Sequence, residues 1–462
     1  MPWLLDLLYV IAATVTSPIW LFRMARTGKI RTDWPGRFGR VQPRIPAPAS
    51  GRQRLLFHAV SVGEVNAIRQ LVERLAGEFD IVIATTTDTG FARAQALWGT
   101  SPHRIVRYPY DFSWAVSRFL NDVRPSAVAL TELEVWPNFT AACQARGVPV
   151  CVINGRLTER SFKRYRVVKW IMHRPFARLA FAAVQNDAYA ARFKGMGAAA
   201  DRVHVAGTMK WDTAQVADRV EGADRLAQEM GIDRSRPLIV AGSTAPGEHE
   251  LLHAATPAGV QLLCAPRKPE WFDQAASALP NCNRRTSANP KTKNQNPRSD
   301  RFLLDTIGEL RMAYALADLV VIGRSFGDLH GSDMMEPAAL GKAVIVGPAV
   351  RDFQDTVDAL RAGDGIVQIT PDQLPQTIAR LLDDPARRRQ IADNARRVIQ
   401  ANQGATERHA QLIRDMLART AAAKNPPPQR GAGAEVEEKE ERLVGEPRLD
   451  AGSGSQTFGH HS

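Results

Sequence analysis

Short apolar runs alternate with amphipathic stretches from Arg54 to about residue 370. Each run is bounded by turn-forming or polar residues, a pattern typical of strands that are buried on both faces of a parallel sheet. The first half of the chain contains six such runs, at 55–60, 80–87, 103–109, 127–133, 148–154 and 179–186. A second series follows at 237–244, 260–266, 300–305, 317–323, 343–348 and 365–370.

Helical stretches separate these runs, for example Glu64–Phe79, Phe91–Leu97, Gly308–Leu316 and Met335–Leu340. Regular alternation of strand and helix predicts an α/β fold with a doubly wound parallel sheet. Because the two series are consecutive and similar in size, we predict two Rossmann-like domains facing across a cleft. The segment Lys210–Arg236 is the expected bridge between them.

The predicted organisation has four parts. Residues 1–30 form a membrane anchor with a basic flank, 31–215 the first domain, 216–420 the second domain and 421–462 a disordered tail. Within the second domain, 281–301 is rich in Asn, Pro, Lys and Arg and predicts an exposed basic loop. The tail contains a proline run, a charged block and a Gly-Ser stretch, a composition that cannot bury a core.

The first apolar segment, Trp3–Phe22, carries a single charge, Asp6. A helix of about twenty residues rises about 30 Å, the thickness of a bilayer's hydrocarbon layer. Cations follow this segment rather than precede it, which argues against a cleaved signal peptide and predicts that the rest of the chain is cytoplasmic. Asp6 leaves open a buried amphipathic helix, and a helix lying in the membrane interface is a further alternative.

Composition and charge narrow the class of protein. The 462 residues are 44% hydrophobic and 23% charged, as in ordinary globular proteins, and the net charge of +12 favours an anionic partner. Four scattered cysteines without a CxxC pair argue against a disulfide framework or a zinc ribbon. We find no metal-binding motif and no nucleic-acid motif, so neither a metal nor a nucleic-acid partner is expected.

Candidate chemistry lies where strands end, since ligands of open α/β sheets bind beyond the carboxyl ends of the strands. Glu64 follows the first strand and opens a helix, where it could be a general base or a first-turn cap. Glu132 and Glu134 are expected on one side of an extended chain and could do acid/base work or bind cations. The five cations of Asn154–Arg166 predict either a phosphate-binding surface or a solvated helix face.

The second half has similar turns. Residues 241–248 close a strand with small residues whose backbone N–H groups could face a phosphate. Arg267 and Lys268 lie at another strand end. A long Gly-containing loop, 323–342, runs into a helix with Glu336, an acid suited to ribose hydroxyls.

Taken together, these motifs resemble the 3-deoxy-D-manno-octulosonic acid (Kdo) transferases of Gram-negative bacteria. The resemblance extends from the N-terminal segment to about Arg419. It rests on HAVSVGEVNA, TTTxTG, PYD, ExExWPN, NGRLxERS, QND, MKWD, GST, PRxPE, DTxGEL and EPAxxGK, in the family's order.

The resemblance implies a two-Rossmann fold of the GT-B type and assigns roles to individual residues. Glu64 matches the family's proton acceptor, while Glu132 and Lys210 match residues that stabilise the transition state. The implied contacts of the nucleotide CMP are Pro266, Arg267, Gly308, Glu309, Leu310, Asp333, Met334, Met335 and Glu336.

It also implies the reaction and its place. The donor would be CMP-Kdo, with no further cofactor and no metal, and the acceptor a lipid A precursor (lipid IVA). Transfer would invert the anomeric centre at the cytoplasmic face of the inner membrane, in lipopolysaccharide biosynthesis. Neither the number of Kdo residues added nor the oligomeric state follows from the sequence.

The chain departs from the family pattern at the donor loop. Ser332 and Asp333 replace the His and Asn of the expected motif, and Arg324 stands where Gly is usual. An added carboxylate near a phosphate should repel it unless Arg324 compensates. In addition, Leu133 stands where the family has Thr, and this change could alter which acceptor is used.

Two other functions fit parts of the pattern. One is a GT-B glycosyltransferase that uses a UDP-sugar and a lipid acceptor. The other is a catalytically silent, membrane-tethered scaffold with a basic surface. Nucleotide preference tests the first, and the activity of a Glu64 variant tests the second.

Overall fold

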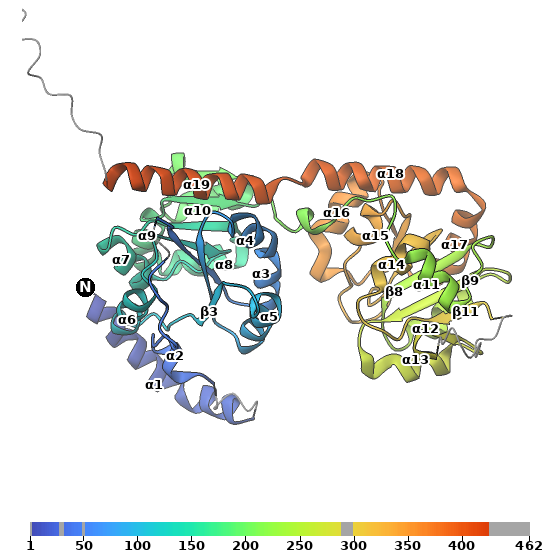
Figure 1. Ribbon diagram of the computed structural model, residues 1–462, viewed down its shortest axis with the longest axis horizontal. Helices are drawn as coiled ribbons and strands as arrows, with labels where there is room; N and C mark the ends of the chain where they lie inside the picture. Colours follow the sequence, from blue (N-terminus) through green and yellow to red (C-terminus); the bar gives the residue numbers. More distant parts are fainter. Residues whose placement is uncertain (1, 27–31, 49–50, 288–298, 425–462) are drawn as a thin grey trace, which may run out of the picture. The chain divides into compact units, whose positions relative to one another are not determined.

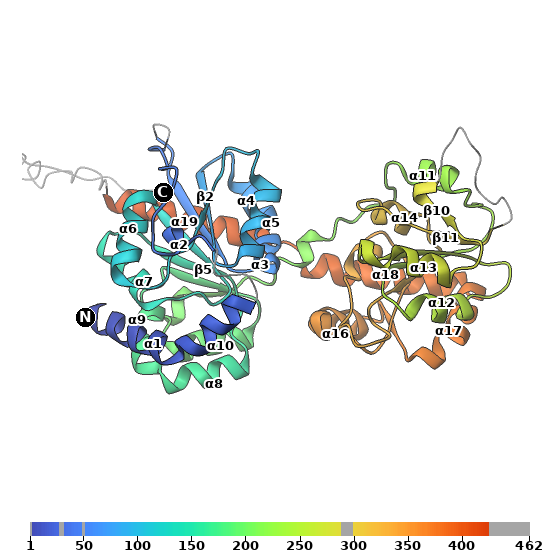
Figure 2. The ribbon, with the colours of Figure 1, turned by 90° about the horizontal axis from the view of Figure 1, so that it is seen from below.

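The computed structural model describes residues 2–26, 32–48, 51–287 and 299–424. It contains two parallel seven-stranded sheets with helices on both faces of each (Figures 1 and 2). We call residues 32–205, around the first sheet, the N-lobe, and residues 223–402, around the second, the C-lobe. The predicted α/β class with two doubly wound sheets is confirmed.

The N-lobe sheet has the strand order β3-β2-β1-β4-β5-β6-β7. Its strands are β1 (Arg54–Ala59), β2 (Asp80–Thr85), β3 (Arg104–Arg107), β4 (Ala127–Thr131), β5 (Val150–Gly155), β6 (Phe181–Val184) and β7 (Val203–Val205). Its helices are α2 (Trp34–Arg37), α3 (Val62–Ala67), α4 (Arg69–Leu75), α5 (Asp88–Trp98), α6 (Ser113–Val123), α7 (Pro137–Ala145), α8 (Glu159–Val167), α9 (Lys169–Ala177) and α10 (Asp187–Met196). The order reverses between β1 and β4, which places a topological switch point there.

The C-lobe sheet has the order β10-β11-β9-β8-β12-β13-β14. Its strands are β8 (Leu238–Thr244), β9 (Gln261–Pro266), β10 (Asn283–Arg284), β11 (Arg301–Leu303), β12 (Leu319–Ile322), β13 (Val344–Val346) and β14 (Val367–Gln368). Its helices are α11 (Ala223–Met230), α12 (Glu248–Ala255), α13 (Phe272–Ala278), α14 (Leu310–Leu316), α15 (Met335–Ala339), α16 (Gln354–Ala362), α17 (Leu374–Asp383) and α18 (Pro385–Asn402). The switch point of this sheet lies between β8 and β12.

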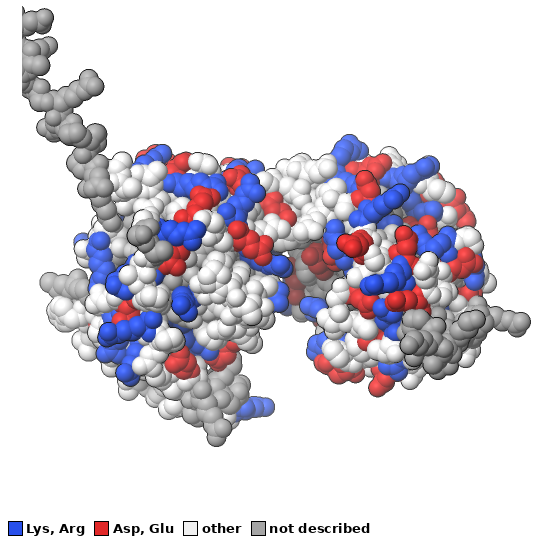
Figure 3. All heavy atoms as spheres, in the orientation of Figure 1, with Lys and Arg blue, Asp and Glu red and all other residues white. Residues whose placement is uncertain are grey.

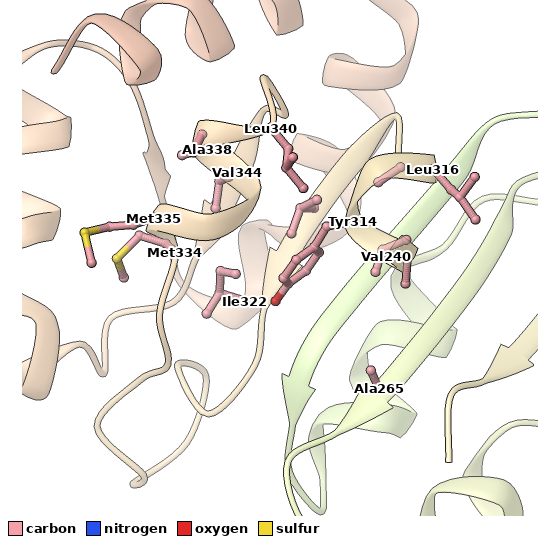
Figure 4. Close-up of a cluster of buried hydrophobic side chains, with 14 of the residues drawn as sticks. Val240, Ala265, Tyr314, Leu316, Ile322, Met334, Met335, Ala338, Leu340 and Val344 are labelled. Atoms are coloured by element: carbon pink, nitrogen blue, oxygen red, sulfur yellow. The ribbon is translucent and has the colours of Figure 1, made fainter. Parts of the chain in front are cut away.

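The strands are continuously apolar because both of their faces are buried. In β8, Leu238 and Val240 belong to one hydrophobic cluster, whereas Ile239 and Ala241 belong to the cluster on the opposite face. Successive strand side chains point to opposite sides, so an alternating pattern would have exposed one face. Figure 4 shows the first of these clusters, in which Val240 and Tyr314 lie against the sheet.

The structure corrects several predicted elements. The helix expected over Glu64–Phe79 is divided at Ile68 into α3 and α4. The strands β7 and β10 were not predicted, because β7 is short and largely exposed and β10 is an Asn-Arg pair. The basic loop expected over 281–301 is too wide, since β10 and β11 occupy its two ends, and 288–298 lies outside the described residues.

The N-terminal segment forms one long helix, α1 (Pro2–Arg26). Within the part of the chain that the structure describes, Trp3–Arg26 is the single helix long and apolar enough to cross a membrane, with a mean hydropathy of 1.7. This test concerns length and composition only. It supports a membrane anchor weakly and does not distinguish a span from a helix on the surface.

The last helix, α19 (Ala405–Lys424), begins beyond the C-lobe and contacts the N-lobe. The backbone N–H of Asn154 in β5 donates to Nε2 of His409 at 2.9 Å. Arg74 pairs with Glu407, and Arg414 pairs with Glu78 at 2.8 Å. The predicted second domain, 216–420, therefore includes a segment, 405–420, whose first turns contact the N-lobe. Most of the predicted tail, 425–462, lies outside the described residues.

Charge is mixed on the face shown in Figure 3, where Lys and Arg side chains alternate with Asp and Glu over both lobes. The excess of 60 basic over 48 acidic residues is therefore not gathered into one large patch on this face. This mixture fits a surface that meets specific anions better than one that tracks a nucleic-acid backbone.

Candidate active site

Glu64 lies in the first turn of α3, directly after β1. Ser61 caps this helix and accepts a hydrogen bond from the Glu64 backbone N–H at 3.4 Å. The Glu64 carboxylate accepts in turn from the Val60 N–H at 2.9 Å and from the Ser61 hydroxyl at 3.1 Å. Glu64 is thus part of the helix cap, which is one of the two roles that the sequence suggested for it.

The surroundings of Glu64 also change its acidity. Burial raises its pKa to about 7, against the opposing hydrogen bond from Val60, and the charges of Glu132 and Glu134 raise it further. A carboxyl group with a pKa near the operating pH can take up a proton during a reaction. Capping and catalysis are compatible here because each carboxylate oxygen has two lone pairs.

Glu132 and Glu134 follow β4, the neighbour of β1 in the sheet. They were expected on an extended chain, but β4 ends at Thr131 and Glu132 has a left-handed backbone with φ of 59°. The expected geometry is therefore wrong, although both charges do act on Glu64. A non-glycine residue in this conformation is strained and is held by its surroundings, a feature that concentrates at functional sites.

Burial raises the pKa of Glu132 and of Glu134. Arg156 and then Lys210 oppose this effect at Glu132, while the Trp136 indole N–H donates to Glu134 at 2.8 Å. Lys210, an exposed residue after β7, therefore acts electrostatically on Glu132, and its role in stabilising the transition state stays a prediction. Arg156 was noted only as one of several cations, and its role appears only when β4 and β5 are seen to be adjacent.

Glu64, Glu132 and Glu134 thus form an acidic cluster at the carboxyl end of the N-lobe sheet, with Arg156 and Lys210 acting on it. Such a group of interacting titratable residues at a switch point can hold a proton acceptor. No group of three or more His, Cys, Asp or Glu side chains suited to a metal occurs in the described parts of the chain.

On the C-lobe, Pro266 and Arg267 lie at the end of β9. Pro266 is buried in the strand, and the exposed Arg267 donates its backbone N–H to the Thr244 carbonyl at 2.9 Å. The guanidinium is free of any hydrogen bond or ion pair with the described residues, so it can meet an anionic ligand.

Gly308, Glu309 and Leu310 form the entry to α14. Gly308 is exposed and has φ of 100°, a conformation that favours glycine. The Glu309 carboxylate already binds Arg285 at 2.9 Å and the Thr306 hydroxyl. The hydrogen bond from Arg285 lowers the pKa of Glu309, so the side chain stays ionised and braces the turn.

The four residues 333–336, which were predicted to contact CMP, differ in their surroundings. Met334 and Met335 are buried in the hydrophobic cluster of Figure 4, at 0% and 4% exposure. These exposures include the backbone, so the implied nucleotide contacts at Met334 and Met335 have almost no surface through which to act. Asp333 is exposed and caps the Met335 N–H at 2.8 Å, and Glu336 lies 3.5 Å from Arg311.

Arg324 does not compensate for Asp333 through any pairing among the described residues. Its guanidinium donates instead to the Leu329 carbonyl at 3.0 Å, within its own loop. Although the Asp333 residue is exposed, its carboxylate is enclosed, and this burial raises the pKa of Asp333. The hydrogen bond from the Met335 N–H and the charge of Lys210 oppose that rise only in part, so Lys210, and not Arg324, is the cation that acts on Asp333.

Glu248 is a residue whose role the sequence did not reveal. Its buried carboxylate accepts backbone N–H groups from Ala245, Arg324, Ser325 and Phe326, at 2.7 to 3.1 Å. It thereby joins the end of β8 to the turn after β12, on either side of the C-lobe switch point. Three of its four partners are 76 to 78 residues away in sequence, so only the fold identifies its role.

The comparisons with known proteins bear on the family and the fold of the chain. A family model described as 3-deoxy-D-manno-octulosonic-acid transferase (kdotransferase) matches residues 32–213. The transferase of that name from Bordetella pertussis is 33% identical over 88% of this chain and 99% of its own length. Its counterpart from Haemophilus influenzae is 28% identical over 79% and 88%.

Solved structures share the architecture. A glycosyltransferase from Rickettsia africae superposes with a TM-score of 0.54 over 79% of this chain and 99% of its own, at 12% identity. Anabaena Alr3699/HepE, solved with UDP, gives a TM-score of 0.52 over 80% and 100%, also at 12% identity. At such low identity these structures bear on the fold alone.

Two Rossmann-like lobes, shared with a solved glycosyltransferase, give the chain the architecture of the GT-B class. The extent and level of identity then give the family: the chain belongs to the 3-deoxy-D-manno-octulosonic acid transferases. Its activity is therefore the transfer of Kdo in lipopolysaccharide biosynthesis, and the silent scaffold is rejected.

Proposed function

We propose that the protein transfers Kdo from CMP-Kdo to a lipid A precursor, lipid IVA, at the cytoplasmic face of the inner membrane. The transfer inverts the anomeric centre and uses no metal. The observation that carries this proposal is the raised pKa of Glu64, about 7, beside Glu132 and Glu134 at the switch point of the N-lobe sheet.

In the proposed reaction, a hydroxyl oxygen of the acceptor attacks the anomeric carbon of Kdo. The new C–O bond forms as the bond from that carbon to the CMP phosphate breaks, and CMP leaves with the electron pair. Glu64 takes the hydroxyl proton. Since the attack comes from the face opposite the leaving group, a single displacement inverts the centre.

Cations offset the charge that develops on CMP. Arg267 has an exposed guanidinium at the end of β9, and Lys210 acts electrostatically on Glu132 and on Asp333. Their charges supply the stabilisation that a leaving phosphate needs. Gly308 is available for the nucleotide because it is exposed and no other part of the protein lies within 4 Å of the place that a side chain would take.

The acceptor and the membrane location are supported by α1 and by the family. An apolar helix next to the N-lobe would keep the acidic cluster at a membrane surface, where a lipid acceptor is found. The positive net charge suits a phosphorylated lipid.

The test is a transfer assay with the full-length protein in detergent micelles. The protein is mixed with lipid IVA and a CMP-Kdo generating system, and product masses are recorded. We expect products heavier by one or more Kdo residues, with loss of product in Glu64→Gln. The proposal fails if a UDP-sugar is transferred in preference to Kdo, or if Glu64→Gln retains full activity.

A further inference from the structure

Two side chains in the first half of α1 fasten it to the N-lobe. The Asp6 carboxylate accepts the Ser113 N–H and the Asn138 side-chain amide, both at 2.9 Å, and also the Ser113 hydroxyl. The Tyr9 hydroxyl donates to Asp111 at 3.0 Å. Residues three apart lie on one side of a helix, so Asp6 and Tyr9 direct one face of α1 toward the lobe.

The partners of Asp6 make this contact specific. Ser113 is the first residue of α6 and Asn138 the second of α7, so a single carboxylate lies at the N-terminal ends of two helices. Such ends carry a partial positive charge, which favours an anion. At α6 the Asp6 carboxylate also accepts a backbone N–H, whereas the first N–H groups of α7, those of Asn138 and Phe139, donate to Asp111. The one charge within the apolar segment is thus a docking group.

This contact conflicts with a helix that spans the bilayer. A span running from Trp3 to Phe22 would carry Asp6 and Tyr9 to the side opposite the lobe, away from Ser113, Asn138 and Asp111. A helix fixed at residues 6 and 9 instead runs along the lobe, beside α7 and α9, as Figure 2 shows.

Between α1, α7 and α9 lies an apolar groove of about 700 Å³. Leu4, Leu8 and Ile11 of α1 line one wall, and Trp170 of α9 lines another. Around it, Trp3, Val15, Ile19 and Phe22 are each more than 60% exposed, and Trp170 is 76% exposed. Apolar surface of this extent on one side of a protein marks an interaction site.

The charge near this surface indicates its partner. Arg174 and Arg178 line the groove, and none of the described residues that line it is acidic. Burial and the neighbouring Arg174 lower the pKa of Arg178, as expected for two cations without an intervening anion. Exposed Arg166 and Lys169 precede Trp170 in sequence. Apolar side chains bordered by cations are typical of helices that lie in an anionic membrane interface.

We propose that α1 lies in the plane of an anionic bilayer's surface and does not cross it. The docked helix, the groove and Trp170 form one face that enters the headgroup region, with lipid hydrocarbon in the groove and Arg174 and Arg178 at the phosphates. This inference refines the membrane location of the proposed function and rests on it only for the choice of membrane.

The first test concerns topology and uses the full-length protein with an epitope tag placed before Met1. In inverted inner-membrane vesicles, which expose the cytoplasmic face, an added protease should remove the tag. In spheroplasts the tag should be protected. The opposite result, protection in inverted vesicles and cleavage in spheroplasts, shows a span and overturns the proposal.

The second test measures binding to vesicles of phosphatidylcholine with and without phosphatidylglycerol. Arg174→Gln and Arg178→Gln should each weaken binding to the anionic vesicles about fivefold, because each basic residue near the surface contributes about that factor. Arg389→Gln, in an exposed residue of α18, is the matched control and should change nothing.

The apolar part of the face is tested with the same vesicles. Trp170→Ser should weaken binding to vesicles of both compositions, whereas Val205→Ser, an exposed apolar residue of β7, should not. Equal affinities for Trp170→Ser and the parent protein would contradict the proposal. The topology and vesicle-binding tests do not measure Kdo transfer, so their results stand even if the transfer assay in micelles fails. Likewise, a failure of these membrane tests leaves the result of the transfer assay unaffected.

Discussion

Two groups of acidic residues, one in each lobe, are held in opposite ways. At the N-lobe switch point, burial raises the pKa values of Glu64, Glu132 and Glu134, and repulsion from acidic neighbours adds to this at Glu64 and Glu134. On the C-lobe, hydrogen bonds from Arg285 lower the pKa of Glu309, and the buried Asp305 is likewise lowered. Asp305 and Glu309 thus brace loops as carboxylates, whereas the N-lobe cluster can take up a proton. The contrast is between these two groups, because burial also raises the pKa of Glu248, Asp333 and Glu336 in the C-lobe.

The largest effect that distinguishes the lobes is expected at Glu64. Glu64→Gln keeps the size and most of the capping contacts but cannot accept a proton, so the transfer rate should fall by about 10²–10⁴-fold. The rate is measured from product mass with saturating donor and acceptor. Glu73→Gln, in an exposed residue paired with Arg69 on α4, is the control and should keep the parent rate.

A substitution on the C-lobe should act on stability instead. Met334→Ala removes a fully buried side chain from the cluster in Figure 4, so the free energy of unfolding should fall by about 2–5 kcal/mol. Thermal unfolding monitored by circular dichroism checks this. Met335→Leu keeps the volume and should cost less than about 1.5 kcal/mol. If Met334→Ala keeps its stability but loses CMP binding, Met334 contacts the nucleotide and does not act through packing.

A third prediction concerns Asp305, whose ionised carboxylate should stabilise the folded C-lobe. Burial raises its pKa, but hydrogen bonds from Thr286 and Arg284 outweigh this, and the pKa lies below its usual value. The ionised form is therefore favoured by folding, and this stabilisation is present above about pH 4 and lost as the pH falls through the lowered pKa.

Asp305→Asn should accordingly lower stability at pH 7 by about 1–3 kcal/mol, with the difference shrinking on acidification. Unfolding curves at several pH values provide the measurement. Asp273, an exposed carboxylate on the same Arg284, is the control, and Asp273→Asn should have little effect. A difference that grows toward low pH would show that Asp305 is not held ionised.

The smallest effect is expected in the pH profile. Transfer should rise with pH through about 7, where Glu64 becomes ionised. Because the negative charge of Glu132 raises the pKa of Glu64, Glu132→Gln should move this rise to lower pH, apart from any loss in rate. The profile of kcat/KM with CMP-Kdo checks the direction, and a rise displaced to higher pH would contradict the assignment.

Much of the fold could be predicted because strands buried on both faces leave unbroken apolar runs. The runs around Leu56 and Val240 are of this kind. The strand β7 leaves no such run, because His204 and Val205 are exposed. A short edge strand is held by its neighbour's backbone, and backbone pairing has no signal in side-chain pattern.

The site was less predictable than the fold. The motif around Glu64 identified a candidate acid, but its raised pKa depends on Glu132 and Glu134, which only the adjacency of β1 and β4 brings near. The left-handed backbone of Glu132 opposes the usual preference of its residue type. Met334 and Glu248 show the same limit, since tertiary packing decides whether a side chain near a motif faces ligand or core.

The passage of α19 back to the N-lobe affects how the protein can be made. On the ribosome, residues 32–205 emerge long before Ala405–Arg414, so the buried N–H of Asn154 has no His409 to bind until synthesis is nearly finished. The packing of the N-lobe is therefore completed only after residues 405–414 have been synthesised. A fragment cut at 215 would lack this contact permanently and should be less stable than the same lobe in the whole protein.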